Sequence, residues 1–196
     1  QAGESRLRLK ETVAARDHFA MAVKLPGIEP ALAETLTMRL GETQSLTSQY
    51  KEAVNTYRQF LNNFRESNWL RNAQFGLGYA LEKNDKPQEA VNEYVKLLND
   101  PKKVDLWTVR GRFQTGECYF NMQQYEQAIA EFVKIEIEFK KYPSWQAKSV
   151  LEIGRVLLAQ GKRDEAIQRF KDVITRYSKE KAAIVARQYL DELRTG

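Results

Sequence analysis

Cysteine and histidine, the residues from which many catalytic and metal sites are built, are almost missing from this sequence. The 196 residues include one of each. A single cysteine cannot form an internal disulfide, and one cysteine with one histidine cannot supply a multi-cysteine or two-histidine metal motif. We therefore expect no enzyme, and no catalytic residue, metal or cofactor. We interpret His18 as an ordinary helical histidine and Cys118 as a small buried side chain.

Proline and glycine are also scarce, and long apolar runs are missing. Five prolines and ten glycines exclude a collagen-like or low-complexity chain. No run of 18 apolar residues occurs, so no direct membrane insertion is expected. No signal peptide is visible and the first residue is not Met, so we expect a mature product or a fragment of a longer chain. The 42% hydrophobic and 29% charged residues are typical of a globular protein.

The net charge of +5 is concentrated toward the C-terminus. The sequence holds 31 basic and 26 acidic residues in all, and residues 144–196 hold 11 basic and 7 acidic ones. Because acidic residues are interleaved throughout, we interpret the charges as solvated helix faces, with a docking patch for an acidic partner as the alternative. No concentrated basic stripe is present, so no nucleic-acid partner is expected.

An internal repeat is the strongest feature that is present. Four glycines are spaced 37, 38 and 38 residues apart, an alanine follows each by twelve positions, and an aromatic residue follows each alanine by four. Three tryptophans keep the same spacing of 38, and a partial copy occurs near the N-terminus. The positions are Gly41, Gly78, Gly116 and Gly154; Ala53, Ala90, Ala128 and Ala166; Tyr57, Tyr94, Phe132 and Phe170; Trp69, Trp107 and Trp145; and Gly3, Ala15 and Phe19.

The pattern predicts a stack of helix pairs, because each pair leaves an apolar side that only the next pair can cover. The glycine on the first helix and the alanine on the second are expected to face one another, with the aromatic residue beside them. The tryptophans are expected to pack where pairs meet, rather than to stack on bases. First helices are expected at about 30–47, 68–83, 104–122 and 144–160, second helices at 50–64, 87–99, 125–140 and 163–177, and flanking helices at 10–24 and 180–194.

These residues resemble the tetratricopeptide repeat family. The matching phrases are GETQSLTSQYKEAVNTY, GYALEKNDKPQEAVNEY, GECYFNMQQYEQAIAEF and GRVLLAQGKRDEAIQRF. The resemblance implies an all-α, right-handed solenoid whose first helices line a concave face. The repeat exceeds the usual 34 residues and, with the linkers FKKYPS and ITRYSKEKAA, is similar to bacterial cell-envelope members of the Tol–Pal coordinator and outer-membrane assembly lipoprotein types. This favours the periplasm or cell envelope, with the cytoplasm as the alternative.

The expected organisation is a single solenoid domain over residues 1–196. It comprises a partial repeat at 1–29, repeats at 30–66, 67–103, 104–141 and 142–178, and a capping helix at 179–196. Ile184, Tyr189 and Leu193 are expected to face the last repeat. The partial repeat indicates that a first helix preceded residue 1.

Two functions remain open from the sequence. One is a scaffold or adaptor that binds a peptide or partner protein in its concave groove, centred on Tyr79, Arg110 and Glu117. The other is a structural module that self-assembles, so that the protein is a monomer or a dimer. The lysine and asparagine pattern of the family's carboxylate clamp is missing, so binding of chaperone tails is not expected. The candidate groove residues are Thr35, Met38, Arg39, Glu42, Asn72, Phe75, Tyr79, Lys83, Arg110, Phe113, Glu117, Asn121, Lys148, Glu152 and Arg155.

Overall fold

The computed structural model describes residues 2–99 and 104–195, with side chains from residue 10 to residue 194. Every regular element in these ranges is an α-helix, and each predicted helix pair is present within a few residues of its expected bounds. The helices are α1 (Ala2–Ala22), α2 (Pro30–Leu46), α3 (Tyr50–Asn63), α4 (Leu70–Lys83), α5 (Pro87–Lys96), α6 (Leu106–Asn121), α7 (Tyr125–Glu138), α8 (Pro143–Ala159), α9 (Arg163–Arg176) and α10 (Lys181–Thr195).

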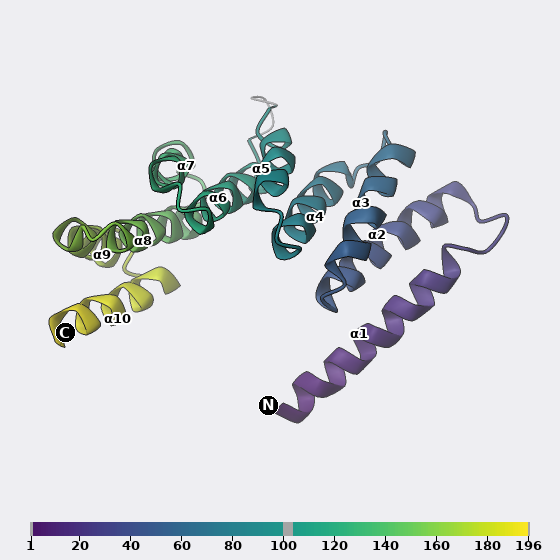
Figure 1. Ribbon diagram of the computed structural model, residues 1–196, viewed down its shortest axis with the longest axis horizontal. Coiled ribbons are helices and arrows are strands. Elements are labelled where there is room, and N and C mark those ends of the chain that lie inside the picture. Colours follow the sequence, from purple (N-terminus) through teal and green to yellow (C-terminus); the bar gives the residue numbers. More distant parts are fainter. Residues whose placement is uncertain (1, 100–103, 196) are drawn as a thin grey trace. The chain divides into compact units, whose positions relative to one another are not determined.

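The chain forms two compact units, Gln1–Asn99 and Asp100–Gly196. In the first unit α1 to α5 pack in chain order, and α2 also contacts α4 (Figure 1). In the second unit α6 to α10 do the same, with α8 contacting both α6 and α10. Within each unit this is the solenoid arrangement of tandem helix pairs, in which first helices line up beside first helices.

A left-handed residue ends the first helix of each pair and turns the chain into the second. Ser48, Asp85 and Gln123 have φ angles of 61°, 59° and 60°, and Gly161 has 75°. Each lies seven positions after the repeat glycine. The following N–H donates to a carbonyl five residues back, as in the bond of 2.8 Å from Gln124 N to Tyr119 O. This is the hydrogen-bond pattern of a Schellman C-cap.

An aromatic ring fills the space that each repeat glycine leaves on the first helix. A Cβ placed on Gly116 would lie 2.6 Å from Phe132 Cε1, and one on Gly154 would lie 2.5 Å from Phe170 Cε1. Tyr57 is in the same position beside Gly41, and its ring also covers Gly76 on the next first helix. The ring therefore joins the two helices of one repeat and, in the first unit, also reaches the next repeat.

The expectation that glycine faces alanine is corrected by these contacts. The atoms nearest to the missing Cβ of Gly116 belong to Phe132 and not to Ala128. Ala128 is nevertheless fully buried, as are Ala53, Ala90 and Ala166. The alanines are therefore small core residues, while the aromatic ring four positions on is the partner of the glycine.

The N-terminal partial repeat is also corrected. Gly3, Ala15 and Phe19 all lie on the single continuous helix α1, with no turn between the glycine and the alanine. The position seven residues after Gly3 is Lys10, which is helical, whereas the same position in the full repeats is left-handed. The register near the N-terminus therefore matches in sequence without forming a helix pair within α1.

The last helix, α10, packs against α8 and α9 as predicted for a capping helix. Tyr189 stacks on Phe170 with ring centroids 4.9 Å apart, and Leu193 also packs against this core. Ile184 was expected to face the repeat, but it is 58% exposed. The small side chains of Ala183 and Ala186 are buried instead, because close approach of α10 favours alanine along the contact.

Candidate functional site

The predicted groove residues lie on the first helices α2 and α4 of one unit and α6 and α8 of the other. Tyr79 belongs to the first unit, and Arg110 and Glu117 belong to the second. The exposed members are Arg39, Lys83, Asn121 and Lys148, and the half-buried members are Thr35, Glu42, Asn72, Phe75, Tyr79, Arg110, Phe113, Glu117 and Arg155.

Two predicted groove residues are buried. Met38 is only 4% exposed and Glu152 only 8%. Met38 belongs to the core of the first unit, and this corrects its assignment as a groove contact. Glu152 accepts a hydrogen bond from Arg155, which is half-buried on the same helix.

On α2, Arg39 links the first two full repeats. Its guanidinium donates to Glu42 one turn later, with 2.7 Å between Nη1 and Oε2. The same guanidinium lies 5.9 Å from the ring of Trp69, which directly precedes α4. A cation over an indole face is attracted by the ring quadrupole, so the contact joins neighbouring repeats on this side.

On α4, Tyr79 is held between an aromatic ring and a cation. Tyr50 of α3 meets it edge-on, with centroids 6.4 Å apart, and Lys83 Nζ lies 5.4 Å from its ring. Lys83 also donates to Glu82 at 2.8 Å, and this hydrogen bond raises the pKa of Lys83. One turn earlier, Phe75 packs against Tyr94 at 5.5 Å. This face presents fixed aromatic rings with a charged group beside them.

In the second unit, the face formed by α6 and α8 pairs tryptophans with cations. Arg110 lies 4.6 Å from the ring of Trp107, and Lys148 lies 4.6 Å from the ring of Trp145, in each case one turn along the same helix. Phe113 lies between the helices and meets Trp145 edge-on at 5.2 Å. The result is a half-buried aromatic floor with positive groups at its surface, which we call the tryptophan–cation face.

Farther along the same two helices lies a carboxyl pair with an arginine. Arg155 Nη1 donates to Glu152 Oε2 at 2.5 Å, and its guanidinium lies 5.6 Å from the Phe120 ring. Burial and the charge of Glu117 raise the pKa of Glu152 to about 7, and a hydrogen bond with Glu117 acts in the same direction. Two carboxyl groups that share a site cannot both ionise freely, so this pair holds a proton near neutral pH.

The tryptophans were predicted as packing residues, and Trp145 does pack against the preceding repeat. Their half-exposed rings with stacked cations were missed. The signal was available in the sequence, because Arg110 and Lys148 each follow a tryptophan by three positions and therefore share its helix face.

The prediction for Cys118 is confirmed, because its side chain is fully buried. His18 lies exposed on α1. Among the residues that the structure describes, no three histidine, cysteine, aspartate or glutamate side chains gather as metal ligands do. None of the described helices combines the length and apolar character that crossing a bilayer requires.

Comparison with known sequences identifies the repeat. The tetratricopeptide repeat model matches residues 36–67, 111–136 and 148–180. These segments cover the first, third and fourth full repeats found from the glycine spacing. No curated protein sequence matches the chain. The family model therefore finds tetratricopeptide repeats in these three segments, as their residues indicated.

Solved structures show the same fold at low sequence identity. The apo form of RapI matches with a TM-score of 0.74 and 19% identity over 92% of this chain and 53% of its own, so the chain spans about half of RapI. MamA matches with a TM-score of 0.68 and 19% identity over 91% of this chain and 96% of its own. YrrB, described as a TPR protein with an unusual peptide-binding site, matches with a TM-score of 0.63 and 19% identity over 92% of this chain and 86% of its own. The chain thus has the all-α fold of tandem helix pairs that these structures share.

Proposed function

We propose that the chain is a non-enzymatic scaffold that binds a peptide or an extended segment of a partner protein on the face of its first helices. The observation that carries this proposal is the tryptophan–cation face, where Arg110 lies over Trp107 on α6, and Phe113 of α6 meets Trp145 of α8 with Lys148 over its ring. Aromatic and arginine side chains contribute most to protein recognition because they bury large areas and donate several hydrogen bonds.

The rigidity of this face supports the same function. Phe113 is fixed from two sides, by Phe132 at 5.4 Å and by Trp145. Rings that are already immobilised lose little conformational entropy when a peptide covers them. The peptide-binding site named for YrrB is a further support, because YrrB shares this fold.

A peptide selected by display from a random dodecapeptide library tests the proposal. Its Kd would be measured for the parent, for Arg110→Glu with Lys148→Glu, and for the control Lys171→Glu on the second helix α9. We expect the double variant to bind at least tenfold more weakly and the control to bind like the parent, once circular dichroism has shown that all three fold. Equal affinity of the double variant would place the binding site elsewhere.

Self-association is a second candidate function, supported by a different observation. Met21, Leu25 and Leu32 surround the turn between α1 and α2 and are 70%, 62% and 51% exposed. Neighbouring exposed apolar side chains are typical of protein contacts. Light scattering during size-exclusion chromatography would show a dimer that Leu25→Lys dissociates and the control Leu46→Lys does not. A monomer at all concentrations excludes this candidate.

We also propose a place in the bacterial cell envelope, which rests on the resemblance of the long repeats and their linkers alone. Fractionation of the native cells with an antibody to the chain tests it. Recovery in the envelope fraction supports the proposal, and recovery with cytoplasmic markers contradicts it.

A further inference from the structure

A hollow of about 500 Å³ lies in the first unit between α1, α2 and α3. It contains none of the candidate groove residues and is therefore separate from the faces described above. Its volume is within the range of small-ligand pockets. Its lining consists of Ala20, Val23, Lys24, Ala33, Thr37, Leu40, Gln44, Thr56, Gln59, Asn63 and Phe64.

Short side chains in the first full repeat explain the hollow. Thr37 and Thr56 occupy the positions that Gln74 and Glu93 hold in the second repeat, where a hydrogen bond of 2.5 Å connects them. In the third repeat the same two positions are Arg112 and Glu131, which form an ion pair of 2.8 Å. The second and third repeats thus close this place with a bridge of long polar side chains, while the two threonines leave it open in the first.

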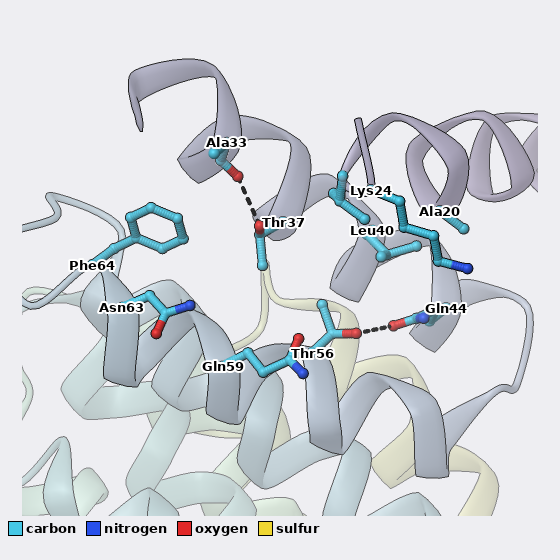
Figure 2. A pocket seen from close by; sticks show the side chains of 11 residues that line it. Ala20, Lys24, Ala33, Thr37, Leu40, Gln44, Thr56, Gln59, Asn63 and Phe64 are labelled. Atoms are coloured by element: carbon cyan, nitrogen blue, oxygen red, sulfur yellow. Dashed lines mark hydrogen bonds between the residues drawn. The ribbon is translucent and has the colours of Figure 1, made fainter. Parts of the chain in front are cut away.

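The polar groups deepest in the hollow are already paired with one another. Thr56 donates to Gln44 Oε1 at 2.7 Å, and Thr37 donates to the Ala33 carbonyl at 2.7 Å (Figure 2). With both threonine hydroxyls donating to protein acceptors, the floor offers the methyl groups of the threonines and the side chain of Leu40, beside the amide of Gln44. Such a floor favours an apolar group.

The outer part of the hollow has the opposite character. Gln59 and Asn63 bring amide groups from α3, and Lys24 extends from the end of α1 on the other side (Figure 2). All three are exposed. Among the described residues of the lining, Lys24 alone carries a charge. The matching ligand therefore has an apolar part, a group that hydrogen-bonds with amides, and an anion.

We propose that this hollow binds the C-terminal residue of a peptide chain, with its apolar side chain on the floor and its carboxylate at Lys24. The peptide N–H and C=O would bond with the amides of Gln59 and Asn63. The proposal rests on the hollow alone and does not depend on the tryptophan–cation face. With Lys24 as the one charge of the described lining, an occupant with a single carboxylate fits best, and an apolar C-terminal residue carries its carboxylate directly beside its side chain.

N-acetyl-leucine is the simplest probe, because it combines the apolar side chain, the amide and the carboxylate. Titration of the ¹⁵N-labelled chain, observed by NMR, should shift the side-chain amide signals of Gln44, Gln59 and Asn63 with a Kd of about 1–10 mM, as the size of the probe allows. N-acetyl-leucinamide, which lacks the carboxylate, should bind at least threefold more weakly. No shift at 50 mM N-acetyl-leucine, or equal binding of the two compounds, overturns the proposal.

Two variants test the floor and the charge separately. Thr37→Gln with Thr56→Gln imitates the long side chains of the second and third repeats, fills the hollow without a change of charge, and should abolish binding. Lys24→Gln should weaken the binding of N-acetyl-leucine and leave the binding of N-acetyl-leucinamide unchanged. The control Lys51→Gln on α3 should change the binding of neither compound. Unchanged binding by the filled variant, or an equal effect of Lys24→Gln and Lys51→Gln, contradicts the assignment.

Discussion

The ring of Phe132 covers Gly116 so closely that a Cβ on this glycine would lie 2.6 Å from the ring. The same relationship recurs between Gly41 and Tyr57, Gly78 and Tyr94, and Gly154 and Phe170. It fixes the distance between the two helices of each repeat. Since the proposed binding face lies on the first helices, this contact also determines where that face lies.

Gly116→Ala should therefore destabilise the fold, although alanine is the better helix former by about 1 kcal/mol. Phe132 is fully buried and its ring cannot move aside, so we expect a loss of about 1–3 kcal/mol in the free energy of unfolding. Urea denaturation measures it. In a double-mutant cycle, Phe132→Leu should recover part of the loss in the Gly116→Ala background, and additive effects would contradict the contact.

The left-handed turn residues give a second prediction, in which the sign of the change differs between repeats. Gln123→Gly should stabilise the protein by about 0.5–1 kcal/mol, because glycine adopts a φ of 60° without steric cost. Gly161→Ala, at a φ of 75°, should destabilise it by about 1 kcal/mol. Thermal unfolding followed by circular dichroism tests both. A lower melting temperature for Gln123→Gly would show that its side chain contributes more than the turn costs.

The carboxyl pair predicts a dependence of stability on pH. The pKa of Glu152 is raised to about 7 in the folded chain, so the folded state holds a proton that the unfolded state releases above about pH 4.5. Stability contributed by this proton is present below pH 4.5 and is lost as the pH rises through 7, by roughly 1–3 kcal/mol.

Glu152→Gln should keep the neutral hydrogen bonds and remove most of this dependence. Urea unfolding at pH 5 and pH 8 would compare the variant with the parent, and Glu165→Gln at an exposed site on α9 serves as the control. A parent protein with the same free energy of unfolding at pH 5 and pH 8 would contradict a shared proton between Glu117 and Glu152. A variant that loses as much stability between these pH values as the parent would contradict it as well.

Removal of the capping helix should expose the core of the last repeat. Deletion of residues 180–196 uncovers Phe170, which stacks on Tyr189, and Val173, which is fully buried. We expect the shortened chain to aggregate, because terminal repeats need a polar outer face. Light scattering at rising concentration measures this, and a monomeric, soluble deletion would show that α10 is dispensable.

The fold was predictable because glycine, alanine and aromatic residues recur at a spacing that only stacked helix pairs satisfy. The residue that contacts the glycine was not predictable. Ala128 and Phe132 lie one turn apart on the same helix, and spacing alone does not tell which of them reaches Gly116. The continuous helix α1 was missed for a similar reason. Gly3, Ala15 and Phe19 imitate the repeat, while the break depends on a left-handed residue that Lys10 does not provide.

The sequence predicts which helix face carries the candidate residues, but it does not predict how deeply each of them is buried. Helical periodicity placed Met38 and Glu152 on the same stripe as their neighbours, yet burial depends on the adjacent helices. Glu152 is buried on α8 and interacts there with Glu117 of α6 and with Arg155. The hollow beside Thr37 arises because the first full repeat lacks the long polar side chains that the next repeat has at the same positions. This difference becomes visible only when the repeats are superimposed.

The central claim is that partners bind on the first helices of the repeats, and photo-crosslinking tests it most directly. Benzoylphenylalanine would replace Asn121, which is exposed at the end of α6, or Ala130, which is exposed on the second helix α7 of the same repeat. The display-selected peptide would then be irradiated with each protein and the products weighed by mass spectrometry. The account predicts a crosslinked product from position 121 and none from position 130, whereas a product from position 130 alone would contradict it.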